Sequence, residues 1–259
     1  MNILDKLAEH AKERVSISKN KVSLEQIKKE AYGLPFSNFK FENALKKKEL
    51  SFICECKKAS PSKRIIDNEF DYIKIAKDYE QANADCLSVL TEPKWFLGSD
   101  THLKEITSIV DIPCIRKDFI VDEYMIYESK LLGASAILLI VSILNEKQLK
   151  KYIEICDELG LSALVEAHDE NEIRVALECN ARLIGVNNRN LKDFSVDTNN
   201  SKRLRSLIPS NVIFVSESGI KDEEDIKTLK EIGVDAVLIG ETLMKAKDKK
   251  ATLKRLRGN

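Results

Sequence analysis

The sequence has no excess of charge of either sign, because its 259 residues include 42 lysines and arginines and 42 aspartates and glutamates. A balanced chain creates no long-range field that would attract nucleic acid or anionic lipid, so neither partner is expected. No apolar run reaches membrane-spanning length, and residues 1–7 interleave charged and apolar side chains instead of forming a signal-peptide core. We therefore expect a cytoplasmic protein in which any anionic ligand is held by a local site.

Patterns that bind metals or form disulfides are also missing. The six cysteines stand at positions 54, 56, 86, 114, 156 and 179 and form no C-x-x-C pair. Buried free thiols in a reducing compartment are therefore expected. The three histidines show no metal-ligand spacing, and His168 is expected to belong to a loop and a helix start rather than to the chemistry. No metal ion is expected.

Short apolar segments alternate with amphipathic ones from residue 52 onward. Strands are expected over 52–56, 86–90, 113–116, 136–141, 163–165, 183–186, 213–215 and 236–239. Helices are expected over 72–82, 123–132, 146–159, 169–178 and 223–232, with Gly133, Gly160 and Gly233 as caps just past three of them. Alternating βα units imply parallel strands with right-handed crossovers.

Eight such strands can close a ring, so the pattern predicts an α/β protein with a (β/α)8 TIM barrel as a single domain over 1–259. A doubly wound open sheet is the alternative, but no G-x-G-x-x-G opens the first βα unit. Residues 1–48 precede the first strand, and Leu4, Leu7, Ala8, Ala11 and Val15 recur there at helical spacing. A helical extension packed against a barrel end is expected, in preference to a partner-binding helix.

The segment 55–63 is the main evidence in the sequence for an active site. Period-two alternation places Glu55 and Lys57 on the same face of a strand, and Pro61 ends that strand soon afterwards. By itself this pair is explained as an ordinary salt bridge at a strand end. Similar polar residues at other strand ends favour an active site.

Polar or glycine residues follow six of the expected strands. In chain order they are Glu55, Lys57 and Ser60; Arg116, Lys117 and Asp118, with Phe119; Glu166; Asn187, Asn188 and Arg189; Glu217, Ser218 and Gly219; and Gly240 and Glu241. The carboxyl ends of barrel strands meet on one face, so these groups should share one mouth. Burying unpaired charges costs on the order of several kcal/mol each, so they must pair or take part in chemistry.

Lys117 is the most informative of these charges. We expect the neighbouring Lys57 and partial burial to lower the pKa of Lys117 and make it a general acid, while Glu166 accepts a proton. A Schiff base is the alternative for such a lysine. Trp95, Phe96 and Phe119 near the rim suit either ordinary packing or a wall for an aromatic substrate.

Glycine turns at Gly219 and Gly240 follow the last two strands and lead into helices. Backbone N–H groups at such turns suit a phosphate, and in this fold a phosphate often binds there. A pair of ordinary tight turns is the alternative. The basic tail 245–257 has Leu253 and Leu256 at helical spacing, which favours a solvated helix over an RNA-binding patch.

The chain resembles the indole-3-glycerol phosphate synthase family from Ile3 nearly to its end. The resemblance is carried by seven ordered motifs, at 55–62, 89–99, 116–120, 164–166, 187–191, 216–220 and 239–244. It implies the substrate 1-(2-carboxyphenylamino)-1-deoxyribulose 5-phosphate and the products indole-3-glycerol phosphate, carbon dioxide and water. It also implies that no cofactor is needed.

The resemblance further implies roles for individual residues. Lys117 would protonate the ketone oxygen during ring closure, and Lys57 and Glu166, assisted by Glu55, would serve the dehydration in a division that stays open. Asn187 and Ser218 would orient the reacting groups. Other implied substrate contacts are Ser60 and Arg189 near the carboxylate, Phe96, Phe119, Leu138 and Leu191 around the aryl ring, and Glu217. The implied phosphate site comprises Ser218, Gly219, Gly240 and Glu241, through backbone N–H groups, because the Glu241 carboxylate would repel a phosphate.

Cys56, Trp95 and Thr242 depart from the usual family residues in ways that concern packing. Two rival functions are considered. Another phosphosugar barrel, such as phosphoribosylanthranilate isomerase, is disfavoured by the Glu55, Lys57 and Lys117 set, and a non-catalytic binding barrel would be expected to lack Lys117 or Glu166. The sequence does not distinguish a monomer from an oligomer.

Overall fold

The computed structural model describes residues 3–47, 49–189 and 195–258, and within them eight parallel strands close a barrel. The strands are β1 (Ser51–Cys56), β4 (Cys86–Leu90), β5 (Cys114–Lys117), β6 (Ala136–Ile140), β7 (Ser162–Ala167), β8 (Leu183–Asn187), β9 (Ile213–Glu217) and β10 (Ala236–Ile239). β1 pairs with both β4 and β10, which closes the ring. The predicted TIM barrel is confirmed, and each expected strand overlaps an observed one.

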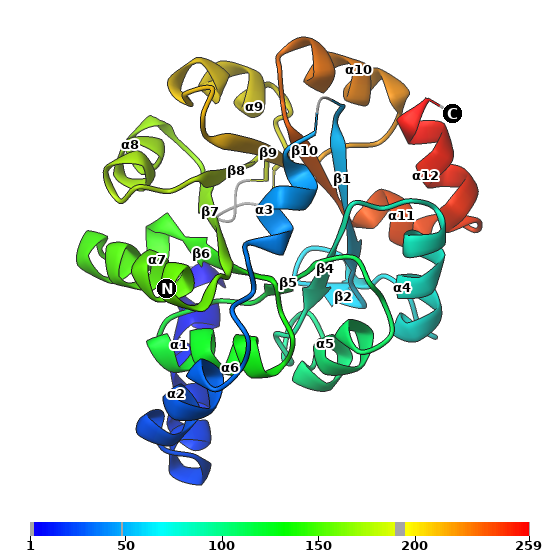
Figure 1. Cartoon of the computed structure of the whole chain (residues 1–259). Helices are drawn as coiled ribbons and strands as arrows, with labels where there is room; N and C mark the ends of the chain where they lie inside the picture. The colour runs from blue at the N-terminus through cyan, green and yellow to red at the C-terminus, as the bar shows by residue number, and fades with distance from the viewer. Residues whose placement is uncertain (1–2, 48, 190–194, 259) are drawn as a thin grey trace.

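Helices surround the barrel, as Figure 1 shows. They are α4 (Tyr72–Gln81), α5 (Asp100–Thr107), α6 (Glu123–Leu131), α7 (Glu146–Leu159), α8 (Glu170–Glu178), α9 (Asn199–Leu204), α10 (Glu223–Glu231), α11 (Glu241–Lys245) and α12 (Lys249–Arg257). Asp or Asn side chains cap several of them; at Asn145, reciprocal bonds with Gln148 form a capping box. Gly133, Gly160 and Gly233 all have positive φ just past a helix, as predicted.

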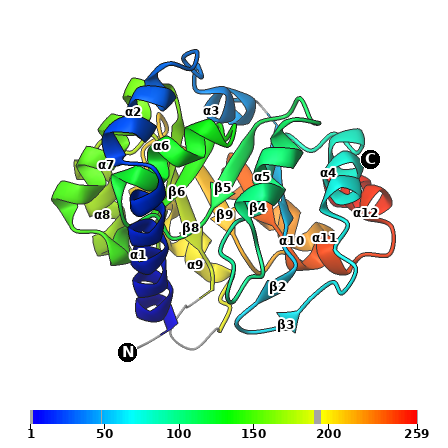
Figure 2. The same cartoon turned by 90° about the horizontal axis from the view of Figure 1, so that it is seen from below.

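The N-terminal extension contributes α1 (Ile3–Lys21), α2 (Leu24–Tyr32) and α3 (Lys40–Leu45). Leu7, Ala11 and Val15 are buried, which confirms the predicted apolar face of α1. α3 covers the end of the barrel where strands begin: the backbone N–H of Glu42 donates to Ser162 at the start of β7. In Figure 2 this end lies at the top, and the opposite, site-bearing end lies at the bottom.

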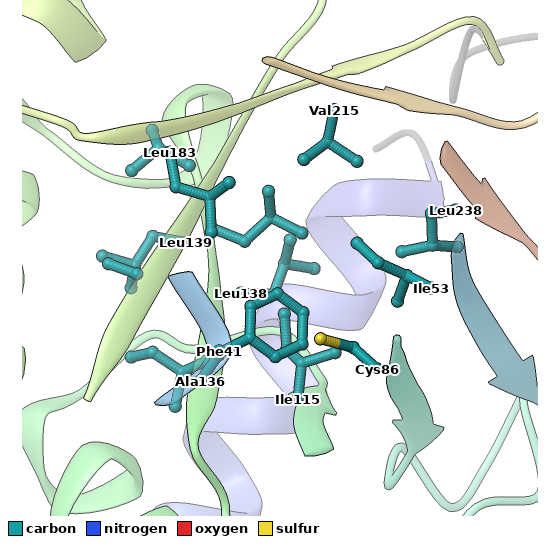
Figure 3. Packing of buried hydrophobic residues seen from close by; sticks show 14 of the residues in the cluster. Phe41, Ile53, Cys86, Ile115, Ala136, Leu138, Leu139, Leu183, Val215 and Leu238 are labelled. Carbon is teal, nitrogen blue, oxygen red and sulfur yellow. The ribbon is translucent and has the colours of Figure 1, made fainter. Parts of the chain in front are cut away.

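The barrel interior changes from apolar to polar along the strands. Figure 3 shows Phe41 of α3 packed among interior side chains that include Ile53, Ile115 and Val215. Side chains two positions further along a strand point to the same face. Glu55 follows Ile53 in this way, as Lys117 follows Ile115 and Glu217 follows Val215. Alternation therefore places a charged layer directly above an apolar one.

The connection between β1 and α4 contains a short hairpin of β2 (Ala59–Ser60) and β3 (Arg64–Ile65), where the sequence predicted a loop. Two 3-10 turns, η1 (Val141–Ile143) and η2 (Arg205–Leu207), complete the secondary structure of the described residues. All six cysteines are free and buried, as expected. In the described part of the chain, none of the helices combines the length and the apolarity that crossing a bilayer requires.

Candidate functional site

A cleft opens at the carboxyl ends of the strands and, with its mouth, encloses about 980 Å³. The predicted site residues that line it are Glu55, Lys57, Ser60, Phe96, Lys117, Phe119, Leu138, Glu166, Asn187, Arg189, Glu217, Ser218, Gly240 and Glu241. Gly219 is not among the lining residues, and Leu191 lies outside the described part of the chain. Leu90, Ile140 and Leu238, with Ile3 and Leu7 of α1, add apolar surface that the sequence did not predict.

Glu55 and Lys57 form an ion pair at the end of β1, as the alternation predicted. The hydroxyl of Ser88 on β4 donates to the second carboxylate oxygen of Glu55 at 3.2 Å. Burial would raise the pKa of Glu55, but Lys57, Lys117 and these hydrogen bonds outweigh it and lower the pKa. Glu55 is therefore an anion at neutral pH.

Lys117 lies between two carboxylates. Its Nζ is 3.3 Å from Oε2 of Glu166 and 3.2 Å from Oε2 of Glu217. Burial would lower the pKa of Lys117, but Glu217, Glu166 and Glu55 outweigh it and raise the pKa. The expectation of a lowered pKa was wrong, because carboxylates rather than Lys57 surround the ammonium. A charged ammonium donates protons but is not a nucleophile, which disfavours the Schiff-base alternative.

The two glutamates beside Lys117 have opposite pKa shifts. Burial, with the charges of Glu166 and Glu55, outweighs Lys117 and raises the pKa of Glu217 to about 7. For Glu166, burial is outweighed by Lys117, by His168 and by a hydrogen bond with Asn187, so its pKa is lowered. One ammonium thus stabilises one anion fully and leaves the second carboxyl able to exchange a proton near neutral pH.

Glu217 was expected only as a substrate contact, so its place beside Lys117 is new. The signal in the sequence was its position two residues after Val215 on β9, which assigns it to the interior. Its carboxylate lies against Gly185 of β8, where a Cβ would come within 2.2 Å of Oε1. A glycine there makes room for the glutamate.

The apolar side of the cleft is formed by aromatic and aliphatic groups. The rings of Phe96 and Phe119 are 6.1 Å apart at 41°, and Leu138 lies on the same lining. Trp95 does not line the cleft; its ring packs edge-on against His10 of α1 at 5.4 Å. Two of the three aromatic residues noted near the rim therefore face the space where a ring could bind.

The two glycine turns lie side by side, because the Thr242 hydroxyl donates to the carbonyl oxygen of Ile220 at 2.5 Å. Ser218 adopts the left-handed region at φ 67°, next to Gly219 at φ 84°. Asn188 supports that turn by donating to the carbonyl oxygen of Ser218 at 3.1 Å. The geometry therefore brings together the turns that the sequence predicted as a phosphate site.

Basic side chains surround this end of the cleft. The Glu241 carboxylate is 3.8 Å from the Lys63 ammonium, 3.8 Å from the Arg189 guanidinium and 2.6 Å from the Lys245 ammonium. Burial would raise the pKa of Glu241, but the hydrogen bond with Lys245 and the nearby charges of Lys63 and Arg189 lower it. The repulsion expected between this carboxylate and a phosphate is therefore offset by three cations.

Residues 4–256 match the sequence profile of the family described as indole-3-glycerol phosphate synthase. The chain belongs to this family. The indole-3-glycerol phosphate synthase of Ruminiclostridium cellulolyticum is 57% identical over 258 residues and that of Leuconostoc mesenteroides 51% identical over 259, each alignment covering 99% of both chains. The crystal structure of 3-hexulose-6-phosphate synthase from Salmonella typhimurium has a TM-score of 0.64 at 13% identity, covering 81% of this chain and 97% of that one, so it shares the fold.

In this member of the indole-3-glycerol phosphate synthase family, α1 is tied to the strand that bears Lys117. The Arg14 guanidinium donates to both oxygens of Asp118, at 3.0 and 2.7 Å, and the Thr91 hydroxyl donates to Asp118 at 2.6 Å. The adjacent Arg116 points away from the cleft and bonds Asp100 of α5 and Glu128 of α6 at 2.7 Å. Sequence reasoning expected a covering role for the extension and missed this contact.

Acidic side chains of a type that can bind a metal ion line the cleft. Across the described ranges, no group of three or more histidine, cysteine, aspartate or glutamate side chains is arranged to hold one. The carboxylates of Glu55, Glu166 and Glu217 contact Lys57 or Lys117, an arrangement that suits proton transfer and charge stabilisation.

Proposed function

We propose that the chain catalyses ring closure, decarboxylation and dehydration of 1-(2-carboxyphenylamino)-1-deoxyribulose 5-phosphate in tryptophan biosynthesis. The products are indole-3-glycerol phosphate, carbon dioxide and water, which makes the enzyme a carboxy-lyase. The observation that carries the proposal is the Lys117 ammonium between Glu166 and Glu217 in the cleft. The match to the family, which extends over residues 4–256, also supports the proposal.

The first step is the attack of the aryl carbon that bears the carboxylate on the ketone carbon. A carbon–carbon bond forms, and the electron pair of the ketone moves to its oxygen. Lys117 protonates that oxygen and becomes neutral. Glu217, whose pKa is raised to about 7, lies 3.2 Å away and is placed to return a proton to the amine.

Decarboxylation and dehydration complete the indole. The bond to the carboxylate breaks, carbon dioxide leaves, and its electron pair restores the aromatic ring. The new hydroxyl then leaves as water with a proton from an acid, while a base removes the proton that remains. Lys57 and Glu166, assisted by Glu55, fill these roles in the proposal, with their division left open.

Binding uses the rest of the cleft. The aryl ring is placed against Phe96, Phe119 and Leu138, and Leu191 stays a predicted contact from the resemblance. Ser60 and Arg189 are placed at the substrate carboxylate, and Asn187 and Ser218 orient the reacting groups. The phosphate is placed at the turns of Gly219 and Gly240, with the backbone at Glu241 as a further donor, where the nearby cations balance its charge.

The rival functions are supported less well. The phosphoribosylanthranilate isomerase alternative does not account for the set formed by Lys57, Lys117, Glu55, Glu166 and Glu217 in one cleft. A binding barrel has no use for a glutamate whose pKa is raised to about 7. The proposal treats 1–259 as one domain, places the enzyme in the cytoplasm, and invokes neither cofactor nor nucleic acid.

The test is product formation by the purified chain. Incubation with the carboxyphenylamino-deoxyribulose phosphate, in buffer containing EDTA, should give rising indole fluorescence and one equivalent of carbon dioxide per indole. Phosphoribosylanthranilate, the isomerase substrate, serves as the comparison. Turnover of phosphoribosylanthranilate alone, or of neither compound, would contradict the proposal.

A further inference from the structure

His168 lies in the loop between β7 and α8, two residues after Glu166. Its position at a loop and helix start was predicted, but its ring also reaches Glu166, one of the groups proposed for the dehydration. Nε2 is 3.5 Å from Oε1 of Glu166, and Nδ1 is 3.2 Å from Oε2 of Glu172 on the first turn of α8. The imidazole therefore stands between two carboxylates.

This geometry favours the imidazolium: Nδ1 is hydrogen-bonded to Glu172, and Nε2 is buried at ion-pair distance from Glu166 with no hydrogen-bond partner among the described residues. A neutral imidazole carries a proton on one nitrogen and a lone pair on the other, so one carboxylate would face a lone pair. Only the imidazolium presents an N–H group to both sides. Glu172 is fixed in place because its Oε2 also accepts the backbone N–H of His168 at 2.8 Å.

Carboxylates dominate the charges that face His168. Glu166 on β7, Glu172 on α8 and Glu217 on β9 all act on it, and Lys117 of β5 lies beyond Glu166. From α9, Asn200 donates to the His168 carbonyl oxygen at 3.2 Å and adds no charge. Burial would lower the pKa of His168, but the three glutamates outweigh it and raise the pKa.

We propose that His168, as an imidazolium, is a positioning residue that holds one oxygen of Glu166 while Lys117 holds the other. Lys117 lies at Oε2 and His168 at Oε1, so each oxygen faces its own cation. When Lys117 gives its proton to the substrate, Glu166 loses one of these cations. His168 then keeps Glu166 ionised and oriented for the dehydration step. This inference rests on the proposed function.

The test combines the pH dependence of kcat with the titration of His168 followed by imidazole nitrogen NMR. In the wild type, kcat should fall at alkaline pH as His168 loses its proton. Glu172→Gln keeps the hydrogen-bond acceptor but removes a charge, so the NMR titration and the alkaline limb of kcat should move together to lower pH. His168→Gln should lower kcat about tenfold, with KM changed less than about twofold, and should remove the part of that limb that follows the imidazole titration.

His102→Gln is the matched control, because His102 packs against Tyr72 at a ring distance of 4.3 Å and is not a cleft residue. His102→Gln should leave the pH dependence of kcat unchanged. An alkaline limb that stays in place while the NMR titration of Glu172→Gln moves would overturn the inference, as would a neutral His168 in active wild type. If the wild type turned over no substrate while the His168 titration moved to lower pH in Glu172→Gln as expected, the result would count against the proposed function instead.

Discussion

Gly185 on β8 lies so close to Glu217 on β9 that an added Cβ would sit 2.2 Å from the carboxylate oxygen Oε1 and 3.1 Å from a methyl group of Leu164. Gly185→Ala should therefore displace the glutamate from Lys117. We expect a loss of about 1–3 kcal/mol in the free energy of unfolding and at least about a tenfold fall in kcat. Urea unfolding and steady-state fluorescence assays measure the two effects.

Gly33→Ala is the control, since Gly33 has a helical φ of −71° at the end of α2. It should change the free energy of unfolding by less than about 1 kcal/mol and leave kcat as it is. If Gly185→Ala and the wild type had equal kcat values, catalysis would not require Glu217 to stay beside Lys117.

Glu217→Gln should affect stability in a pH-dependent way. The folded protein raises the pKa of Glu217 from 4.5 to about 7, so between these values the folded state binds more protons than the unfolded state. Wild-type stability contributed by this group therefore falls as pH rises through that window, by up to about 3 kcal/mol. A glutamine imitates the protonated acid and does not lose a proton.

The variant and the wild type should consequently unfold with similar free energies near pH 5. Near pH 8 the variant should be more stable by about 1–3 kcal/mol, although its kcat is lower. Urea titrations at the two pH values make the comparison. If the free energies of unfolding of the variant and the wild type differed by the same amount at pH 5 and at pH 8, the pKa of Glu217 would not be raised.

Arg14→Met should separate α1 from β5. Asp118 is fully buried, and the bidentate contact with Arg14 helps to keep its pKa low against the effect of burial. Breaking this pair should cost about 2–4 kcal/mol, since a buried carboxylate then loses a cation. That contribution is present above the ordinary pKa of aspartate and is lost as pH falls through the lowered pKa.

Lys12→Met on the same helix removes an exposed ion pair with Glu9 and should cost less than about 0.5 kcal/mol. Chemical unfolding of both variants gives the comparison. If the two losses were equal, the Arg14 contact would contribute no more than a surface pair. Activity should also fall in Arg14→Met alone, because Asp118 adjoins Lys117.

The barrel was predictable because its signals are local. Each strand is a short, mostly apolar run, the helices α4, α7, α8 and α10 have an amphipathic period, and capping residues mark helix ends. The short α5 and α9 escaped prediction because six to eight residues give too little periodicity. The β2–β3 hairpin escaped because it pairs only two residues on each side.

The site was predictable as a set of positions but not as a set of charges. Strand-end location and alternation placed Glu55, Lys117 and Glu217 at one mouth. The sequence cannot state which charges become neighbours across the ring, so the pKa of Lys117 was predicted in the wrong direction. The contact of Arg14 with Asp118 joins residues 104 positions apart and depends on the docking of α1.

The most direct measurement is a single-turnover reaction of Lys117→Met, with Lys58→Met as its control. Lys58 follows Lys57 in the chain but does not line the cleft. The account predicts that Lys117→Met binds the substrate with little change in Kd but forms indole about 10³-fold more slowly than the wild type. Lys58→Met should react at the wild-type rate. Indole formation by Lys117→Met at the wild-type rate would contradict it.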